Sequence, residues 1–205
     1  HLPEPVYVAD LAAIVGLGKS AFSRLFKKST GRTVPQYVNE LRIARACLLL
    51  AETGDTTNAR AELSRARSLA QGDAATLLEI GSALRQLSDF EGAERAIRDA
   101  ITANEDQVTP TLAAELALAQ LGRNDNAAAR ATLEQALTVH PDDATLHFYL
   151  GRVAVARDDV PAARSAFTRM LELESSSERA TSVRAWLAEH PEPRPTRPGG
   201  RRPTR

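Results

Sequence analysis

The 205-residue sequence has few aromatic side chains, one cysteine and no long apolar run. Aromatic residues make up only 4% of the chain while alanine is abundant, a balance that favours close helix packing over a β-sheet. Cys47 cannot form an internal disulfide, and its place in an apolar helical stripe predicts a small core residue. No segment approaches the roughly 20 apolar residues of a membrane span, and no signal peptide opens the chain. We therefore expect a cytoplasmic protein without a membrane partner.

Net charge is also lacking, because 26 basic and 26 acidic side chains balance. Their placement is uneven: residues 1–52 carry seven basic and four acidic groups, residues 53–190 carry fourteen and twenty-one, and residues 191–205 carry five and one. Basic ends therefore flank an acidic middle. Since the first residue is His1 rather than methionine, we expect a fragment or a processed product.

The stretch from Thr33 to Thr53 has the clearest signals of a helix. Thr33 and Gln36 have the spacing of a capping box, and Pro35 falls in the first turn, where a missing N–H costs nothing. Gly54 can take the left-handed conformation that ends a helix. Two apolar stripes predict that more than one face is covered, and their members are Tyr37, Leu41, Ala44, Leu48 and Ile43, Ala46, Cys47, Leu50.

Two shorter helices joined by a glycine-bearing turn are predicted before this stretch, at residues 8–15 and 19–30. The second has an apolar side, made of Ala21, Phe22, Leu25 and Phe26, and a polar, basic side. This is the helix-turn-helix pattern, in which small polar side chains and an arginine contact bases while lysines contact phosphates. The base contacts predicted on this interpretation are Ser20, Ser23 and Arg24, and the phosphate contacts are Lys19, Lys27 and Lys28. The alternative is that these residues are only the solvated face of an amphipathic helix.

The run from Leu11 to Leu50 resembles the first helix-turn-helix of the AraC/XylS family of transcription regulators together with its linker helix. The matching positions are Leu11, Ala12, Gly16, Phe22, Arg24, Phe26, Lys27, Gly31, Pro35, Tyr37, Arg42, Ala46, Leu49 and Leu50. The resemblance implies double-stranded DNA as a partner and positions 20, 23 and 24 as those that reach bases. Three features depart from the family: Gly18 replaces the usual capping serine, the preceding helix is absent, which favours truncation upstream, and no second helix-turn-helix follows.

From Gly54 onward three columns of residues recur in register, at spacings of 34, 36 and 34. The columns are Ala59, Ala93, Ala129, Ala163; Leu63, Ile97, Leu133, Phe167; and Ala66, Ala100, Ala136, Met170. They resemble tetratricopeptide repeats, four helix pairs over residues 40–177, with two extra residues in the loop from Asn104 to Pro110. On this register the linker helix is also the first helix of the first repeat.

The resemblance implies a concave groove lined by the first helices, which binds a protein or peptide partner. Transferring the groove positions by register gives Ser82, Arg85, Gln86, Phe148 and Arg152, and the alternative is that the two arginines are ordinary surface charges. Residues 178–190 are predicted to be a capping helix whose Val183, Trp186 and Leu187 cover the open end. Residues 191–205 are predicted to be a disordered basic tail.

Other chemistry finds little support in the sequence. Gly18-Lys19-Ser20 resembles the end of a phosphate loop, but that motif needs a glycine where the chain has Ala13. His140, Asp142, Asp143 and His147 straddle a turn and are better explained as solvated caps than as metal ligands. No nucleophile has a recognisable catalytic partner, so we expect neither an enzyme nor a cofactor.

These observations predict an all-α protein in four parts: a helix-turn-helix at residues 1–39, a solenoid at 40–177, a capping helix at 178–190 and a tail at 191–205. The predicted function is that of a DNA-binding transcription regulator whose repeat array binds a protein partner or self-associates as a homodimer. The alternative is a scaffold or adaptor protein that carries a non-functional helix-turn-helix remnant.

Overall fold

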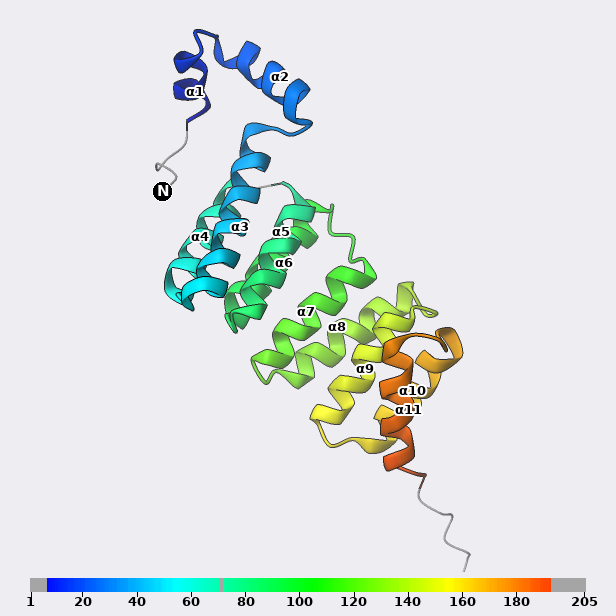
Figure 1. The fold of residues 1–205 in the computed structure, drawn as a ribbon. Coiled ribbons are helices and arrows are strands. Elements are labelled where there is room, and N and C mark those ends of the chain that lie inside the picture. Colours follow the sequence, from blue (N-terminus) through cyan, green and yellow to red (C-terminus); the bar gives the residue numbers. More distant parts are fainter. Residues whose placement is uncertain (1–6, 71, 193–205) are drawn as a thin grey trace, which may run out of the picture. The chain divides into compact units, whose positions relative to one another are not determined.

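The computed structural model describes residues 7–70 and 72–192, and every regular element in these ranges is a helix (Figure 1). Most of the predicted basic tail, residues 193–205, lies outside the described residues. The chain forms two compact units that divide between Asp125 and Asn126, and we describe each by itself. No helix in the described part of the chain combines the length and apolar character needed to cross a membrane.

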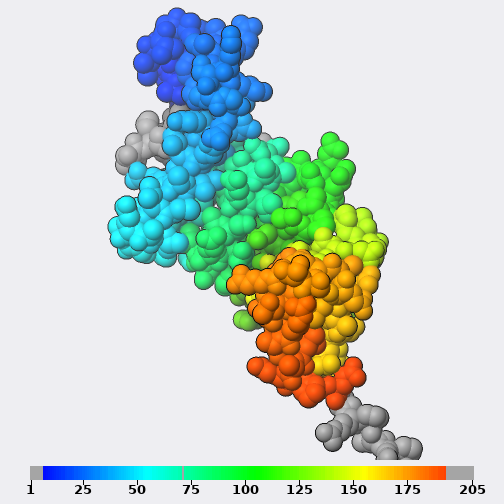
Figure 2. Space-filling view, turned by 45° about the vertical axis from the view of Figure 1, so that its right-hand side comes forward, coloured from blue at the N-terminus to red at the C-terminus, as the bar shows by residue number. Residues whose placement is uncertain are grey.

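The first unit contains seven helices that follow one another with short connections. They are α1 (Val8–Ile14), α2 (Lys19–Thr30), α3 (Val34–Thr53), α4 (Thr56–Leu69), α5 (Ala74–Gln86), α6 (Phe90–Ala103) and α7 (Pro110–Gly122). Helices α3 and α4 pack as a pair, α5 and α6 form the next pair, and α7 packs on both members of that second pair. At the other end α1 packs on α2, and α2 meets α3 through a smaller contact. In the space-filling view α1 and α2 stand clear of α4 to α6 (Figure 2).

The core of the first unit is made of the residues that recur in the sequence. Leu63 and Ile97 are buried between paired helices, with a buried alanine one turn to either side of each. Gly81 lets α5 and α6 approach, because a Cβ atom there would lie 2.6 Å from Cγ1 of Ile97. The predicted columns therefore mark the helix contacts, as expected for a stack of helix pairs.

Each turn inside a helix pair has the same backbone design. A residue with positive φ, either Gly54, Ser88 or Asp158, lies two residues before the start of the pair's second helix. The aspartates that follow them, Asp55, Asp89 and Asp159, accept a hydrogen bond from the backbone N–H three residues later. Between pairs, residues 104–109 form a loop two residues longer than residues 70–73 or 140–143, as the sequence predicts.

The second unit contains α8 (Asn126–Val139), α9 (Ala144–Ala156), α10 (Val160–Leu173) and α11 (Glu178–Glu189). Helices α9 and α10 pack closely because Gly151 has no side chain: a Cβ atom there would lie 2.3 Å from the Phe167 ring. Helix α11 covers α10, with Val183 buried and the Trp186 ring edge-on to Phe167 at 5.1 Å between centroids. It therefore caps this end of the helix stack, as predicted.

Two predictions about the buried faces are wrong. Cys47, predicted to be a core residue, is exposed. The stripe of Tyr37, Leu41, Ala44 and Leu48, predicted to be covered, also lies at the surface. The reason is that α4 and α5 both contact the opposite side of α3, where Ala46 is buried.

Candidate nucleic-acid interface

The first two helices and their turn form a helix-turn-helix. Gly16 turns the chain after α1 with a φ of +67°, and the Leu17 N–H donates to the carbonyl of Ala12 at 2.9 Å. Gly18 precedes α2 without a capping side chain, and Gly31 ends the helix in the left-handed conformation. The first turn of α2 therefore has backbone N–H groups that no capping side chain satisfies.

Helix α2 is held from one side by aromatic contacts. The Phe22 and Phe26 rings lie 5.8 Å apart, and Phe26 meets Tyr37 of α3 edge-on at 5.5 Å. These two phenylalanines are half-buried, and no residue of α2 is fully buried. Leu25, predicted to face inward with them, is 53% exposed, because none of the described residues packs over that side of the helix.

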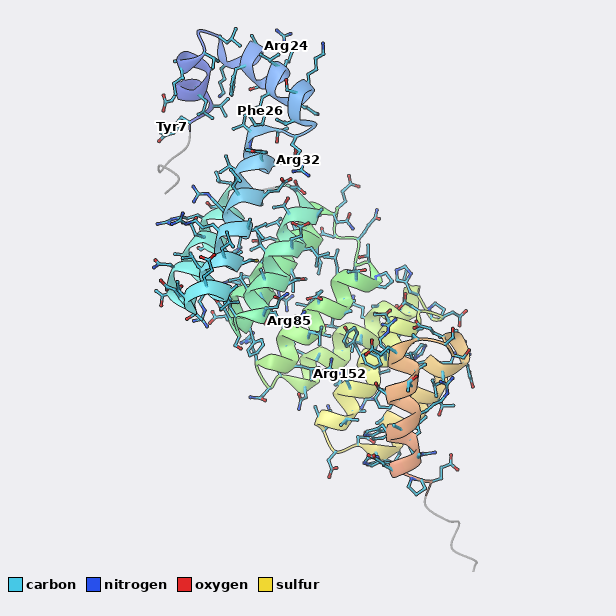
Figure 3. The ribbon with its side chains drawn as sticks, in the orientation of Figure 1. Tyr7, Arg24, Phe26, Arg32, Arg85 and Arg152 are labelled. Atoms are coloured by element: carbon cyan, nitrogen blue, oxygen red, sulfur yellow. The ribbon has the colours of Figure 1, made fainter. Side chains whose placement is uncertain are left out.

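The opposite side of α2 presents the predicted contact residues to solvent. Figure 3 shows Arg24 projecting away from α3, whereas Phe26 points toward it. Ser20 and Arg24 are exposed one turn apart, and Ser23 beside them is half-buried. The lysines predicted to meet phosphates, which are Lys19, Lys27 and Lys28, are all exposed.

The charge on α2 is of one sign. The helix carries three lysines and one arginine and no acidic residue. None of these four side chains takes part in an ion pair that the structure shows within the described ranges. Arg32, which follows the helix, is paired with Glu40. The surface of α2 therefore offers cationic groups that remain available to an anionic ligand.

Helix α3 connects this surface to the helix pairs by two polar contacts that sequence reasoning did not identify. Gln36 completes the capping box of α3 and also donates from Nε2 to Asp73 Oδ2 at 3.2 Å, and Asp73 caps α5. Burial tends to raise the pKa of Asp73, but hydrogen bonds from the Thr76 N–H and from Gln36 lower the pKa below its usual value. Further along α3, the buried Arg42 is paired with Glu62 of α4.

The residues predicted to line a partner groove fall in both units. In the first, Ser82 is half-buried, Gln86 is exposed, and Arg85 is engaged by Glu115 through two hydrogen bonds of 3.0 and 3.3 Å. In the second, Arg152 lies 5.8 Å from the Tyr149 ring centroid, and the Phe148 ring is covered by Arg179 of α11 at 5.6 Å. Arg85 is thus committed to an internal pair that sequence reasoning did not anticipate.

The residues weighed as metal ligands have other roles. Asp143 caps α9, Asp142 is paired with Arg169, and a ring nitrogen of His147 lies 2.8 Å from the Pro141 carbonyl oxygen. Within the described ranges no group of three potential ligands is close enough together to hold a metal ion.

Comparison with known families agrees with this division of the chain. A helix-turn-helix domain model matches residues 11–64, and tetratricopeptide repeat models match residues 74–107 and 114–178. The chain joins an AraC-type helix-turn-helix to tetratricopeptide repeats. The predicted resemblance to an AraC-type helix-turn-helix and to tetratricopeptide repeats is confirmed, and so is the all-α fold class. None of the curated proteins matches the chain.

Solved tetratricopeptide repeat proteins share the fold at low sequence identity. A MamA fragment from Desulfovibrio magneticus RS-1 is 20% identical with a TM-score of 0.55, covering 83% of this chain and 93% of that one. A tetratricopeptide repeat protein from Parabacteroides merdae is 18% identical with a TM-score of 0.55, covering 75% and 60%. The first repeat domain of RPAP3, bound to the HSP90 peptide SRMEEVD, is 19% identical with a TM-score of 0.51, covering 58% and 94%.

Proposed function

We propose that the chain is a sequence-specific DNA-binding regulator in which α2 enters the major groove. The observation that carries this proposal is the one-signed, unpaired and outward-facing surface of α2, since an adaptor has no need of it. Arg24 would bind the two acceptors of a guanine, with Ser20 and Ser23 beside it. Lys19, Lys27 and Lys28 would bind phosphates on either side and set the position of the helix.

Two further features support docking on DNA. The first turn of α2 has unsatisfied N–H groups, which together with the helix dipole attract a phosphate. The aromatic contact between Phe26 and Tyr37 fixes α2 against the start of α3 while its other side stays free. The arrangement presents a short helix whose cationic side chains form no ion pair with the residues that the structure describes.

The repeats are proposed to recruit a protein partner. In the RPAP3 structure a repeat domain of this type is bound to an HSP90 peptide. The lysine and asparagine set with which some repeat proteins clamp a C-terminal carboxylate is not present in this chain, so we propose an internal segment of a protein as the ligand. In the first unit Ser82 and Gln86 remain proposed contacts, whereas Arg85 would first have to leave Glu115. In the second unit Arg152 remains a proposed contact, and so does Phe148, although Arg179 would first have to move off its ring.

The second candidate function is that of a repeat adaptor whose helix-turn-helix no longer binds DNA. The observation that favours it is the thin packing of α1 and α2, in which Ala12 is the one fully buried residue among residues 8–30. In an adaptor of this kind, the remaining role of α1 and α2 would be to cover the start of α3.

The two candidates differ in how DNA binding responds to two matched substitutions on α2. Arg24→Ala is expected to lower affinity for the selected sequence by about 1 to 3 kcal/mol and to change affinity for random DNA much less. Lys27→Ala is expected to weaken both alike. The selected sequence would come from repeated selection of random duplexes with the full chain, followed by titration at one fixed salt concentration. Failure to enrich any sequence, or equal losses for both variants on both DNAs, would reject the base-reading role and favour the adaptor.

A further inference from the structure

The side of α3 that faces away from α4 and α5 carries an apolar stripe, whose first member, Tyr37, also contacts Phe26 of α2. Tyr37, Leu41 and Leu48 are 39%, 40% and 55% exposed, and Ala44 between them is also exposed. Their spacing of four, three and four residues is that of the a and d positions of a heptad repeat. We call these four residues the α3 seam.

The seam is specific to α3 among the first helices of the repeats. At the positions that correspond to Leu41, Ala44 and Leu48, every later first helix has at least one polar residue. These positions hold Ala75, Leu78 and Ser82 in α5, Thr111, Ala114 and Leu118 in α7, and Thr145, Phe148 and Arg152 in α9. The uninterrupted apolar stripe is therefore not a general property of the groove-lining positions.

The charges that flank the seam complement one another. On a helical wheel Glu40 lies along one edge of the seam, at a g position, and Arg45 lies along the other, at an e position. Their side chains are 40% and 42% exposed, and each also has an intramolecular partner, Arg32 for Glu40 and Glu62 for Arg45, that it would share with the second copy. When two identical helices pair in parallel, the g residue of each helix faces the following e residue of its partner. Glu40 of one copy would then meet Arg45 of the other, twice in each dimer.

We propose that the α3 seam is the self-association surface of this protein and that its occupant is the seam of a second copy, aligned in parallel. Apolar a and d residues flanked by opposite charges form a self-complementary surface. Three half-exposed side chains bury less than the roughly 800 Å² per partner of a standard interface, so the dimer is weak and depends on protein concentration.

A parallel pairing along α3 places both helix-turn-helix units at the same end of the dimer. Two copies of α2 would then be available to two half-sites of one duplex, which is how single helix-turn-helix units gain specificity. This consequence rests on the proposed DNA-binding function, whereas the pairing itself does not.

The test uses disulfide trapping of the full chain without DNA. In a Cys47→Ser background, Leu48→Cys places the two sulfurs opposite each other in a parallel pair and out of register in an antiparallel one. The matched control is Val139→Cys in the same background, because Val139 is also an exposed apolar residue but lies on α8. We expect mild oxidation to give several-fold more covalent dimer for Leu48→Cys than for Val139→Cys.

Sedimentation equilibrium then asks whether the seam and its charges cause association. Leu41→Glu with Leu48→Glu is expected to make the chain monomeric while its circular dichroism stays unchanged, since both side chains are exposed. Arg45→Glu should weaken association, and adding Glu40→Arg should restore it, while unchanged circular dichroism confirms that losing the contacts with Glu62 and Arg32 leaves the fold intact. A chain that stays monomeric at hundreds of micromolar, equal trapping of both cysteine variants, or a dimer that survives the double glutamate substitution would overturn the proposal. Because no DNA is present, these results are independent of whether α2 binds DNA.

Discussion

Arg42 of α3 and Glu62 of α4 form an ion pair of 2.9 Å in which their side chains are only 3% and 12% exposed. Arg65 reaches the same carboxylate at 3.2 Å and Arg45 reaches it at 3.7 Å. Glu62 therefore supplies a carboxylate to the buried guanidinium on the helix that follows the helix-turn-helix. This ion pair links α3 to α4 within the buried part of their interface.

We predict that Glu62→Ala lowers the free energy of unfolding by about 3 to 5 kcal/mol, because it breaks the buried ion pair between Arg42 and Glu62. Glu91→Ala is the matched control, since it removes a helical ion pair with Arg95 whose side chains are 68% and 55% exposed. That control should cost less than about 1 kcal/mol. Urea unfolding followed by circular dichroism measures both, and equal losses would show that the buried pair has no special weight.

Glu94 of α6 should make stability depend on pH. Burial tends to raise the pKa of this carboxyl, but hydrogen bonds from Arg98 and Arg123 outweigh burial and hold the pKa below the ordinary value of 4.5. A lowered pKa in the folded state means that the ionised carboxylate stabilises the fold above the unfolded value and that this contribution is lost as the pH falls through the folded pKa. Glu94→Gln should therefore destabilise the chain by roughly 1 to 2 kcal/mol at pH 7. The difference between wild type and variant should shrink as unfolding is measured at progressively lower pH below 4.5, and a constant difference would contradict this origin.

The close packing of Gly151 against Phe167 predicts a specific pattern of rescue. Gly151→Ala places a methyl group 2.3 Å from the ring and should cost about 2 to 3 kcal/mol by overpacking. In a Phe167→Leu background, which removes the ring, the same substitution should cost less than about 1 kcal/mol. A double-mutant cycle measured by thermal unfolding gives the coupling directly. Additive effects would mean that the helices move apart rather than clash.

The three lysines of α2 predict the salt dependence of DNA binding. Each phosphate contact contributes a slope of about −0.9 to log K against log salt concentration, so one copy should show a slope of about −3. Lys28→Ala should make the slope less negative by about 1, whereas Arg24→Ala should leave it nearly unchanged if Arg24 contacts a base. Fluorescence anisotropy over a series of salt concentrations measures each slope. A slope that is the same for Lys28→Ala and wild type would exclude Lys28 from the phosphate contacts.

Much of the fold is predictable because local signals agree with one another. The capping box of Thr33 and Gln36 and the left-handed Gly54 fix the ends of α3 without reference to the rest of the chain. The repeat register follows from buried residues such as Leu63 and Ile97, since each helix pair needs the same contacts at the same spacing. These features depend on residues that are close together in the sequence, so the sequence alone is enough to predict them.

The features that could not be predicted depend on which other helix packs against a given face. Two stripes of α3 are equally apolar, and only the placement of α4 and α5 decides that Ala46 is buried while Leu48 is exposed. Arg85 reads as a free groove residue until α7 brings Glu115 within 3.0 Å. For α2, the helical spacing correctly predicts that Arg24 is exposed and that Phe26 is on the buried side. The spacing does not predict whether another element covers Leu25, which is exposed.

Helix α3 runs without interruption from Val34 to Thr53, with Arg42 in its first half. No loop therefore separates the helix-turn-helix from the first repeat, and a genetic exchange between them would have to splice two half-helices. A junction after Arg42 that gains or loses one residue turns everything beyond it by about 100°, which would rotate Glu62 away from Arg42. Recombination can exchange repeats at the loops further along the chain. Within α3, an exchange must preserve the rotational phase of the helix as well as the codon reading frame.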